Sequence, residues 1–174
     1  MMNFNVKEIG KVCCDEAGFS IKLNEEYRKA LTGLEGFGYV QVIWWFDGCD
    51  NDAARSNLTV KKPYTNGPEV LGTFATRSPA RPNPIAISSS YVTFIDDENG
   101  VIGLAWIDAN DGTPVLDIKP YTPSVDRVED PIVPDWCAHW PKNVETSGDF
   151  DWEKEFRFQY KKSDSVLICF KNVL

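Results

Sequence analysis

Apolar and polar side chains alternate along several stretches of the chain, and this pattern predicts short β-strands. Residues 38–46 are mostly aromatic and β-branched, and residues 85–95 alternate throughout. An Asn-Gly pair then leads into a second apolar run at 101–107, and such a turn between two runs predicts a hairpin. Further strands are expected at residues 6–12 and 19–23, and a second hairpin at residues 156–160 and 166–170.

The segments between these runs predict one short helix and several irregular regions. In residues 24–31, Asn24 suits the N-cap position, acidic residues fill the first turn, and a glycine follows the end. Residues 47–65 are polar and rich in turn formers, so we expect a surface loop there. Residues 131–148 predict an irregular tail packed over the domain, in which the tryptophans supply packing area rather than a base-stacking platform.

Six or more short strands with little helix predict a mostly β protein, built as a barrel or a sandwich. The 174 residues, 43% of them hydrophobic, suffice for one domain with its own core. No apolar run approaches the ~20 residues that a transmembrane helix needs. The N-terminus also lacks the basic and apolar regions of a secretory signal. We therefore expect a soluble, cytoplasmic, single-domain protein without membrane contact.

The five cysteines and the single histidine offer little metal or redox chemistry. The cysteines are odd in number and widely spread, and the adjacent pair Cys13-Cys14 lacks a CxxC spacing. Free thiols in a reducing compartment are therefore the favoured interpretation. His139 beside Cys137 cannot complete a zinc site without remote ligands. We expect a packed histidine, no metal, and no histidine-based hydrolytic triad unless His139 serves in it.

Charge is distributed unevenly along the chain. The net charge is −8, which argues against a surface generally covered by nucleic acid. Residues 55–82 nevertheless carry five basic side chains against a single acid, Glu69, for a local charge of +4. This segment is either a chance cluster of basic residues on a solvated loop or a binding site for an anion such as phosphate or carboxylate.

Two polar loops, residues 76–84 and residues 108–121, are expected to form the functional centre. In the first, three prolines fix the backbone and remove donors, so two arginines and an asparagine are presented on a stiff support. The second contains an Asp-Gly-Thr-Pro turn, which has a purely structural explanation. It also gathers three carboxylates, a lysine, a hydroxyl and a phenol, which could bind ribose hydroxyls while backbone amides face a base edge.

These loops closely resemble the signatures of the TsaA-like (TrmO-type) family, and the resemblance extends from about residue 6 to residue 125. The matching sequences are FATRSP at 74–79, RPNPI at 81–85, DGTPVLDIKPY at 111–121 and LEGF at 34–37. The resemblance implies a β-barrel, a homodimer and the cofactor S-adenosylmethionine (SAM). It also implies methylation of N6 of threonylcarbamoyl-adenosine beside the anticodon of tRNA.

The resemblance also assigns candidate site residues. The expected cofactor-binding residues are Phe46, Asp47, Gly48, Arg77, Asp111, Gly112, Thr113 and Pro114. Expected substrate-binding residues are Arg81, Asn83, Lys119 and Tyr121, with Arg81 alternatively bracing its own loop. Lys61 and Lys62 have no role in the motifs; as adjacent lysines of the basic segment they are expected phosphate contacts for RNA, or they only keep a loop soluble. Because the N6 lone pair is delocalised, a base that removes its proton would help, and Asp47 and Asp108 are the candidates. Either aspartate could instead be a structural cap or turn residue.

Some positions depart from the family pattern. Asp47 stands where many members have histidine, Ala86 where glycine is frequent, and the separate C-terminal domain of long members is missing. We therefore expect a short-branch member, with a SAM-binding barrel over residues 1–130 and a tryptophan-rich tail and hairpin over 131–174 packed on the same domain. Two alternatives to tRNA methylation stay open: methylation of another substrate, and a noncatalytic SAM-binding module.

Overall fold

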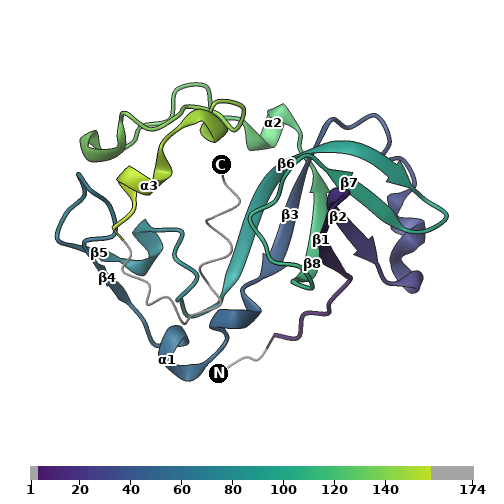
Figure 1. Cartoon of the computed structure of the whole chain (residues 1–174), viewed down its shortest axis with the longest axis horizontal. Coiled ribbons are helices and arrows are strands. Elements are labelled where there is room, and N and C mark those ends of the chain that lie inside the picture. Colours follow the sequence, from purple (N-terminus) through teal and green to yellow (C-terminus); the bar gives the residue numbers. More distant parts are fainter. Residues whose placement is uncertain (1–3, 158–174) are drawn as a thin grey trace. The chain divides into compact units, whose positions relative to one another are not determined.

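The computed structural model describes residues 4–157, which fold into two compact units (Figure 1). Within these residues, the barrel unit comprises residues 4–47 and Ile85–Asp126, and the second unit comprises Gly48–Pro84 and residues 127–157. Each unit is therefore assembled from two separate stretches of sequence. The domain limits predicted at 1–130 and 131–174 stay a prediction.

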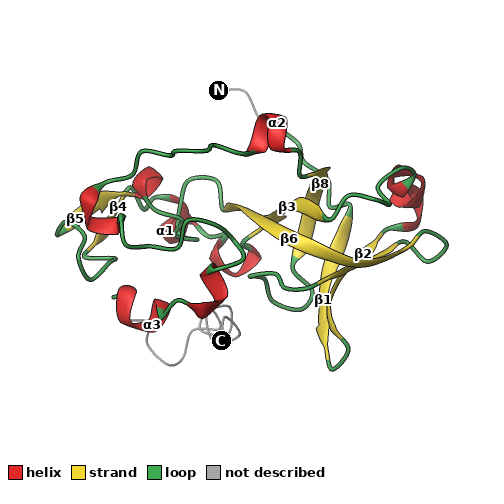
Figure 2. Cartoon of the chain, turned by 90° about the horizontal axis from the view of Figure 1, so that it is seen from above, coloured by secondary structure: helices red, strands yellow, loops and turns green. Residues whose placement is uncertain are grey.

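The barrel unit is a closed barrel of six antiparallel strands in the order β1-β2-β7-β6-β3-β8. Figure 1 labels these strands, and Figure 2 shows the strands of the chain in yellow. Its strands are β1 Gly10–Asp15, β2 Gly18–Leu23, β3 Tyr39–Trp45, β6 Ile85–Asp96, β7 Val101–Leu104 and β8 Pro114–Pro120. Two short helices accompany them, the 3₁₀-helix η1 Glu25–Leu31 and α2 Pro123–Asp126. The mostly β fold and the barrel predicted from the sequence are confirmed.

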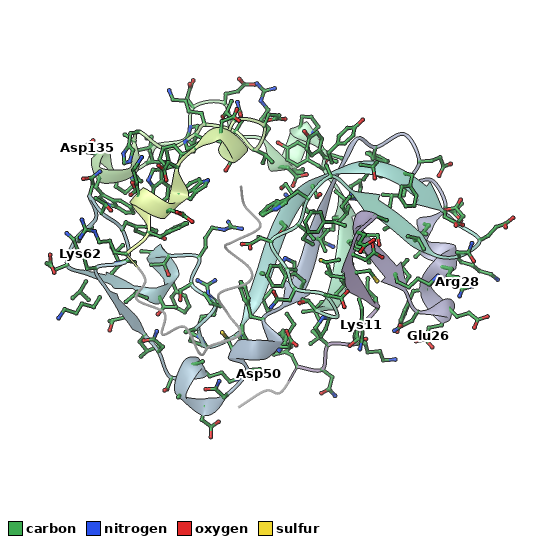
Figure 3. All side chains as sticks on the ribbon, viewed as in Figure 1. Lys11, Glu26, Arg28, Asp50, Lys62 and Asp135 are labelled. Carbon is green, nitrogen blue, oxygen red and sulfur yellow. The ribbon has the colours of Figure 1, made fainter. Side chains whose placement is uncertain are left out.

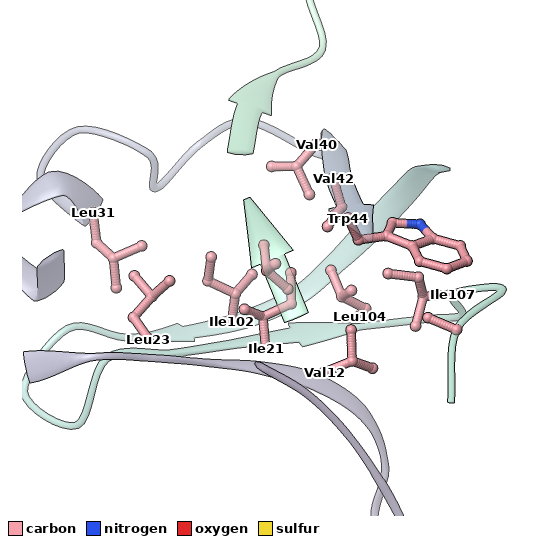
Figure 4. Packing of buried hydrophobic residues seen from close by; sticks show 12 residues of the cluster. Val12, Ile21, Leu23, Leu31, Val40, Val42, Trp44, Ile102, Leu104 and Ile107 are labelled. Atoms are coloured by element: carbon pink, nitrogen blue, oxygen red, sulfur yellow. The ribbon is translucent and has the colours of Figure 1, made fainter. Parts of the chain in front are cut away.

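Period-2 alternation explains why these residues form a barrel. Along β3, Val40, Val42 and Trp44 are buried, while the residues between them are half-buried on the outer face. The inward residues meet Val12, Ile21 and other aliphatic side chains in a single core (Figure 4). Closing the sheet leaves no unpaired edge, so every strand of the barrel has two neighbours.

Three predicted strands are confirmed as β2, β3 and β6, and two others differ at one end. The strand expected at 6–12 begins only at Gly10, where the chain passes so close to β2 that a Cβ atom would lie 2.3 Å from the Lys22 carbonyl oxygen. The strand expected at 101–107 ends at Leu104. The chain leaves the ladder there, although Ile107 still reaches the core.

The prediction of a loop over residues 108–121 is wrong in its second half, because β8 occupies Pro114–Pro120. This strand pairs with both β1 and β3. Prolines at both ends and charged side chains at Asp117 and Lys119 hide its alternation. The predicted helix at 24–31 is the 3₁₀-helix η1, and the Asn24 side chain donates to the Glu8 carbonyl at 3.1 Å instead of capping it.

In the part of the chain that the structure describes, the second unit contains only short elements. They are the 3₁₀-helix η2 Asp47–Cys49 at its start, α1 Asp52–Arg55, β4 Thr59–Lys61, β5 Val70–Gly72, η3 Thr73–Ala75, η4 Asp135–Cys137, η5 Ser147–Asp149 and α3 Trp152–Glu155. The surface loop predicted at 47–65 is therefore wrong, because α1 and β4 lie within it. Asn51 makes α1 possible, since its side-chain oxygen accepts the Ala54 amide at 3.0 Å.

Aromatic rings form the centre of the second unit. Tyr64 stacks on Trp136 with ring centroids 5.2 Å apart and meets Trp140 edge-on at 5.0 Å. Trp152 continues the cluster, 5.5 Å from Trp140 and 5.4 Å from Phe156. The tail tryptophans thus provide packing area, as predicted, and they pack on one another and on Tyr64 from residues 48–84.

The hairpin predicted at 156–160 and 166–170 lies outside the described residues except for its first two positions. Within residues 4–157, no helix is long and apolar enough to cross a membrane.

Candidate cofactor site

The Asp-Gly-Thr turn of the barrel unit is tied to β1 by three hydrogen bonds. The Cys14 amide donates to Asp111 Oδ1 at 2.9 Å, and the Gly112 amide donates to the Val12 carbonyl at 2.8 Å. The Val12 amide in turn donates to the Thr113 carbonyl at 2.9 Å. Gly112 has φ +79°, a left-handed conformation that glycine adopts without a Cβ clash. The turn is therefore held rigidly before any ligand arrives.

These contacts correct one expectation about the turn. The amides of Gly112 and Thr113 donate within the barrel unit, to Val12 at 2.8 Å and Asn110 at 3.2 Å. They are thus engaged by the protein and do not face a base edge. Thr113 is also buried, whereas the Asp111 carboxylate is exposed. Asp111 is thus the exposed charged group of this turn, and its Oδ1 also accepts the Cys14 amide.

The end of β3 presents a second exposed carboxylate. Phe46 is half-buried against Trp44, with ring centroids 4.4 Å apart, and Pro114 is half-buried at the start of β8. Asp47 and Gly48 follow Phe46 and are both exposed in η2. Asp108 differs, because it is half-buried between Ile107 and Ala109, which belong to the core.

The first polar loop contains no regular strand or helix over 76–84, as predicted. Hydroxyl groups hold its start: Thr76 Oγ1 donates to the Thr73 carbonyl at 2.8 Å and accepts the Ser78 amide at 3.2 Å. Thr76 and Ser78 are buried, and Arg77 between them is exposed. The loop thus presents the Arg77 side chain from a fixed backbone.

Arg81 braces this loop. Its Nη2 donates to the carbonyls of Thr73 at 3.1 Å and Thr76 at 2.7 Å, and the side chain is partly buried. The structure therefore favours the bracing alternative for Arg81. Asn83, two residues later, is exposed.

The two lysines of the β4 segment differ in their surroundings. Lys61 is exposed at the end of β4. Lys62 has φ +44°, and its Nζ donates to the Gly67 carbonyl at 2.9 Å and lies 3.3 Å from a Glu69 oxygen. It is labelled beside the β4–β5 hairpin in Figure 3. Lys62 thus stabilises the hairpin that displays Lys61.

The remaining candidates lie on or just after β8. Lys119 forms an exposed ion pair with Asp117 at 2.7 Å. Tyr121 donates its amide to the Tyr39 carbonyl at 2.9 Å, and the two rings lie 6.4 Å apart. The structure therefore places Lys119 and Tyr121 with Asp47, Asp108 and Asp111 in the barrel unit. The basic candidates Lys61, Lys62, Arg77 and Arg81 belong to the second unit.

Residues 9–127 match the model of a protein family described as the tRNA-methyltransferase O N-terminal domain. This span covers most of the chain and includes both polar loops. The chain belongs to this family. The resemblance inferred from the two loops is therefore confirmed.

Relatives in this family carry related descriptions. An S-adenosyl-L-methionine-binding protein of Archaeoglobus fulgidus is 37% identical over 65% of this chain and 76% of its own length. A tRNA (adenine(37)-N6)-methyltransferase of Eikenella corrodens is 43% identical, over 64% of this chain and 62% of the relative. A crystal structure of TrmO superimposes with a TM-score of 0.60 at 31% identity, covering 76% of this chain and 64% of that one. The chain thus spans less than two thirds of these last two proteins.

The TrmO-family loops carry groups that fit SAM. The Arg77 guanidinium suits a carboxylate, and the exposed carboxylates of Asp111 and Asp47 suit an ammonium group or ribose hydroxyls. By contrast, in residues 4–157 no three histidine, cysteine or acidic side chains gather as metal ligands would.

Cys14 and Val12 are supporting residues that the sequence pattern missed. Cys14 donates its amide to Asp111 and its thiol to the Ala109 carbonyl at 3.5 Å. Burial raises the pKa of the Cys14 thiol, and the nearby Asp111 charge raises it further. No pattern in the sequence links two segments 97 residues apart through backbone amides. Only the barrel closure between β1 and β8 brings them together.

Proposed function

We propose that this protein is a SAM-dependent methyltransferase that methylates the N6 nitrogen of a modified adenosine in tRNA. One observation carries the proposal: the family match over residues 9–127 includes both loops whose exposed side chains suit SAM. The name of the Eikenella relative supports the same reaction.

The reaction requires alignment more than covalent chemistry. SAM supplies an electrophilic methyl group on a sulfonium, and the nucleophile displaces it in line. The Arg77 guanidinium would hold the carboxylate of the cofactor, and Asp111 would hold its ribose or ammonium group. Alignment of the bound cofactor with the acceptor nitrogen can supply several kcal/mol of the barrier reduction. The rigid backbones of the two loops serve this role because they lose little freedom on binding.

A carboxylate would accept the N6 proton. Asp47 is exposed at the end of β3, whereas Asp108 is half-buried next to the core. An aspartate that acts only as a base loses activity when it becomes asparagine, while SAM affinity stays nearly constant; weaker SAM binding in Asp47→Asn would instead indicate a cofactor contact. Asp47→Asn and Asp108→Asn should therefore be compared by single-turnover rate and by SAM dissociation constant. A normal rate in both variants would exclude a carboxylate base at either position.

RNA would approach the basic segment of residues 55–82, because the overall charge of −8 repels polyphosphate elsewhere. Lys61 is exposed, whereas the Lys62 ammonium is held by Gly67 and Glu69. Lys61→Ala should therefore lower tRNA affinity and reduce the salt slope by about 1, and Lys62→Ala should do less. Equal tRNA affinity in wild type and Lys61→Ala across a salt series would contradict this docking face.

We also propose that the protein forms a homodimer and acts in the cytoplasm. The support for the homodimer is an exposed apolar outer face on β6, where Ile85, Ile87 and Phe94 are each at least 40% exposed. A patch of this kind on one strand suits a second copy of the chain. Light scattering at micromolar concentration should give twice the mass of one chain. A monomer mass would contradict the assembly.

A second candidate function is methylation of a substrate other than tRNA. The acidic net charge favours it, because a small acceptor needs no polyphosphate contact. A noncatalytic SAM-binding module is the third possibility.

Labelled SAM incubated with bulk tRNA separates these functions. Label in tRNA supports the proposal, and SAM binding without RNA label leaves the other two. A screen of small-molecule methyl acceptors would then distinguish methylation of another substrate from noncatalytic SAM binding. In all cases Arg77→Ala should weaken SAM binding more than Arg81→Ala, the matched loop variant, because only Arg77 is exposed to a ligand. Equal losses with both proteins folded would refute the assignment of Arg77.

A further inference from the structure

We infer that Tyr64 is a positioning residue for Arg77, and that the tryptophan-rich tail after residue 127 supports it. The inference rests on the proposed SAM-binding role of Arg77. It assigns a role to residues 128–157, which lie beyond the residues 9–127 that match the family model.

The Tyr64 hydroxyl contacts the Arg77 backbone directly. The Arg77 amide donates a hydrogen bond to the phenol oxygen, and the Arg77 charge is near enough to act on it. Burial raises the pKa of Tyr64, and the Arg77 amide and charge partly offset that rise. Tyr64 is only 5% exposed. The buried Tyr64 phenol oxygen therefore holds the backbone amide of Arg77, whose own side chain is exposed.

The tail in turn fixes the Tyr64 ring. Trp136 stacks on one side at 5.2 Å, Trp140 meets the ring edge at 5.0 Å, and Phe156 lies 5.9 Å away. Aromatic packing of this kind restricts the ring to one orientation, which also fixes its hydroxyl. Without the tail rings, the Tyr64 ring would have other rotamers available.

Backbone contacts strengthen the same connection. Tyr64 forms a β-bridge with Phe156, and the Thr65 amide donates to the Glu155 carbonyl at 2.9 Å. The Thr65 hydroxyl also donates to the Lys154 carbonyl at 2.6 Å. The tail therefore reaches the Arg77 loop through three consecutive links: α3 to residues 64–65, the aromatic rings to the phenol, and the phenol to the Arg77 amide.

Tyr64→Phe is the sharpest test, because it keeps the ring and removes the acceptor oxygen. We expect SAM to bind about tenfold more weakly, since the Arg77 amide is left without its partner. The matched control is Tyr27→Phe on η1, which loses a hydroxyl bonded to Glu26 and should bind SAM like wild type. Titration calorimetry measures all three proteins.

A double-mutant cycle separates positioning from general stability. If Tyr64 acts through Arg77, adding Tyr64→Phe to Arg77→Ala should change SAM affinity less than about twofold. A merely structural role would instead lower SAM affinity by the same factor in both backgrounds. That result would overturn the inference, as would wild-type SAM affinity in Tyr64→Phe. Absence of SAM binding in the wild-type protein would overturn the proposed function itself, and the inference with it.

Amide hydrogen exchange tests the part played by the tail. The Arg77 amide should exchange faster in Tyr64→Phe, and also in Trp136→Leu, which loosens the stacked ring while leaving the phenol in place. Unchanged Arg77 exchange in a folded Trp136→Leu protein would show that the tail does not position the loop. This measurement needs no ligand, so it remains informative if either variant binds SAM poorly.

Discussion

The barrel unit and the second unit are stabilised by different kinds of contact. In the barrel, backbone ladders close on themselves around aliphatic side chains such as Val12, Ile21 and Val42. The second unit has one two-stranded sheet, and its centre is a group of aromatic rings around Tyr64. Side-chain hydroxyl and guanidinium groups then hold its loops, as Thr76 and Arg81 do.

This difference indicates how each unit responds to substitution. An aliphatic core surrounded by a closed ladder tolerates small changes at the surface but loses stability when an interior volume is removed. An assembly of rings and single polar contacts depends on fewer, more specific bonds. Substitutions in the barrel should therefore act on global stability, and substitutions in the second unit should act first on the geometry of the Arg77 loop.

The largest expected effect is that of Trp44→Ala in the barrel. Trp44 is 2% exposed, packs on Phe46 and donates its indole nitrogen to Ser88 Oγ at 2.9 Å. The free energy of unfolding should fall by about 3–5 kcal/mol in urea denaturation. Ile132→Ala is the control, because Ile132 is fully exposed and should change stability by less than about 0.5 kcal/mol. Similar losses in the two variants would contradict the assigned core.

Gly103→Ala tests the packing where β6 and β7 change register. A Cβ atom at Gly103 would lie 2.2 Å from the Phe94 ring and 2.5 Å from Thr93 Oγ1. The clash should cost about 1–3 kcal/mol of unfolding free energy. Phe94→Ala in the same chain should recover part of this loss because it removes the ring. Additive losses in the double variant would show that the two sites do not touch.

His139→Ala tests a polar contact of the second unit. His139 Nε2 lies 2.9 Å from Glu155 Oε2, and the Glu155 side chain is only 6% exposed. Removing the imidazole leaves a buried carboxylate without this partner, which should cost about 1–2 kcal/mol. Adding Glu155→Gln should restore part of the stability, since the neutral amide is cheaper to bury. If the His139–Glu155 contact does not stabilise the fold, the urea denaturation midpoint of His139→Ala will equal that of the wild type.

The smallest effect is expected from Tyr64 at alkaline pH. Burial raises the pKa of its phenol above the ordinary value of about 10, so the folded state holds the proton more tightly than the unfolded state. The resulting stability is complete below pH about 10 and is lost as the pH rises through the folded pKa. Urea midpoints from pH 8 to 11.5 should therefore fall more in wild type than in Tyr64→Phe. Parallel profiles would contradict a buried phenol.

The barrel was largely predictable because most of its strands show a period-2 alternation in the sequence. In β3 the inward residues Val40, Val42 and Trp44 are apolar at every second position, so period-2 reasoning finds this strand. β6 also alternates, but its apolar residues Ile85 and Ile87 are exposed and Ser90 is buried. β8 was missed because its outward positions carry Asp117 and Lys119 and its ends are prolines. Its pairing with β1 and β3 overrides this unfavourable local pattern.

The candidate site was predictable in its exposed residues and not in its supports. Arg77 and Asp111 stand in recognisable motifs and are exposed. Arg81 looks equivalent to Arg77 in the sequence, yet it bonds two carbonyls of its own loop. Tyr64 and Cys14 act through contacts with residues far away in the chain. Only the tertiary fold determines which of these side chains is exposed and which supports a loop.

The division of each unit into two stretches of sequence affects the order of events during synthesis. Residues 48–84 leave the ribosome well before the tail, and Tyr64 cannot stack on Trp136 or bridge to Phe156 until those residues have been made. β6, β7 and β8 emerge in between and can close the barrel first. A nascent chain that stops after residue 126 thus contains every barrel strand, while its Arg77 loop still lacks the rings that hold it.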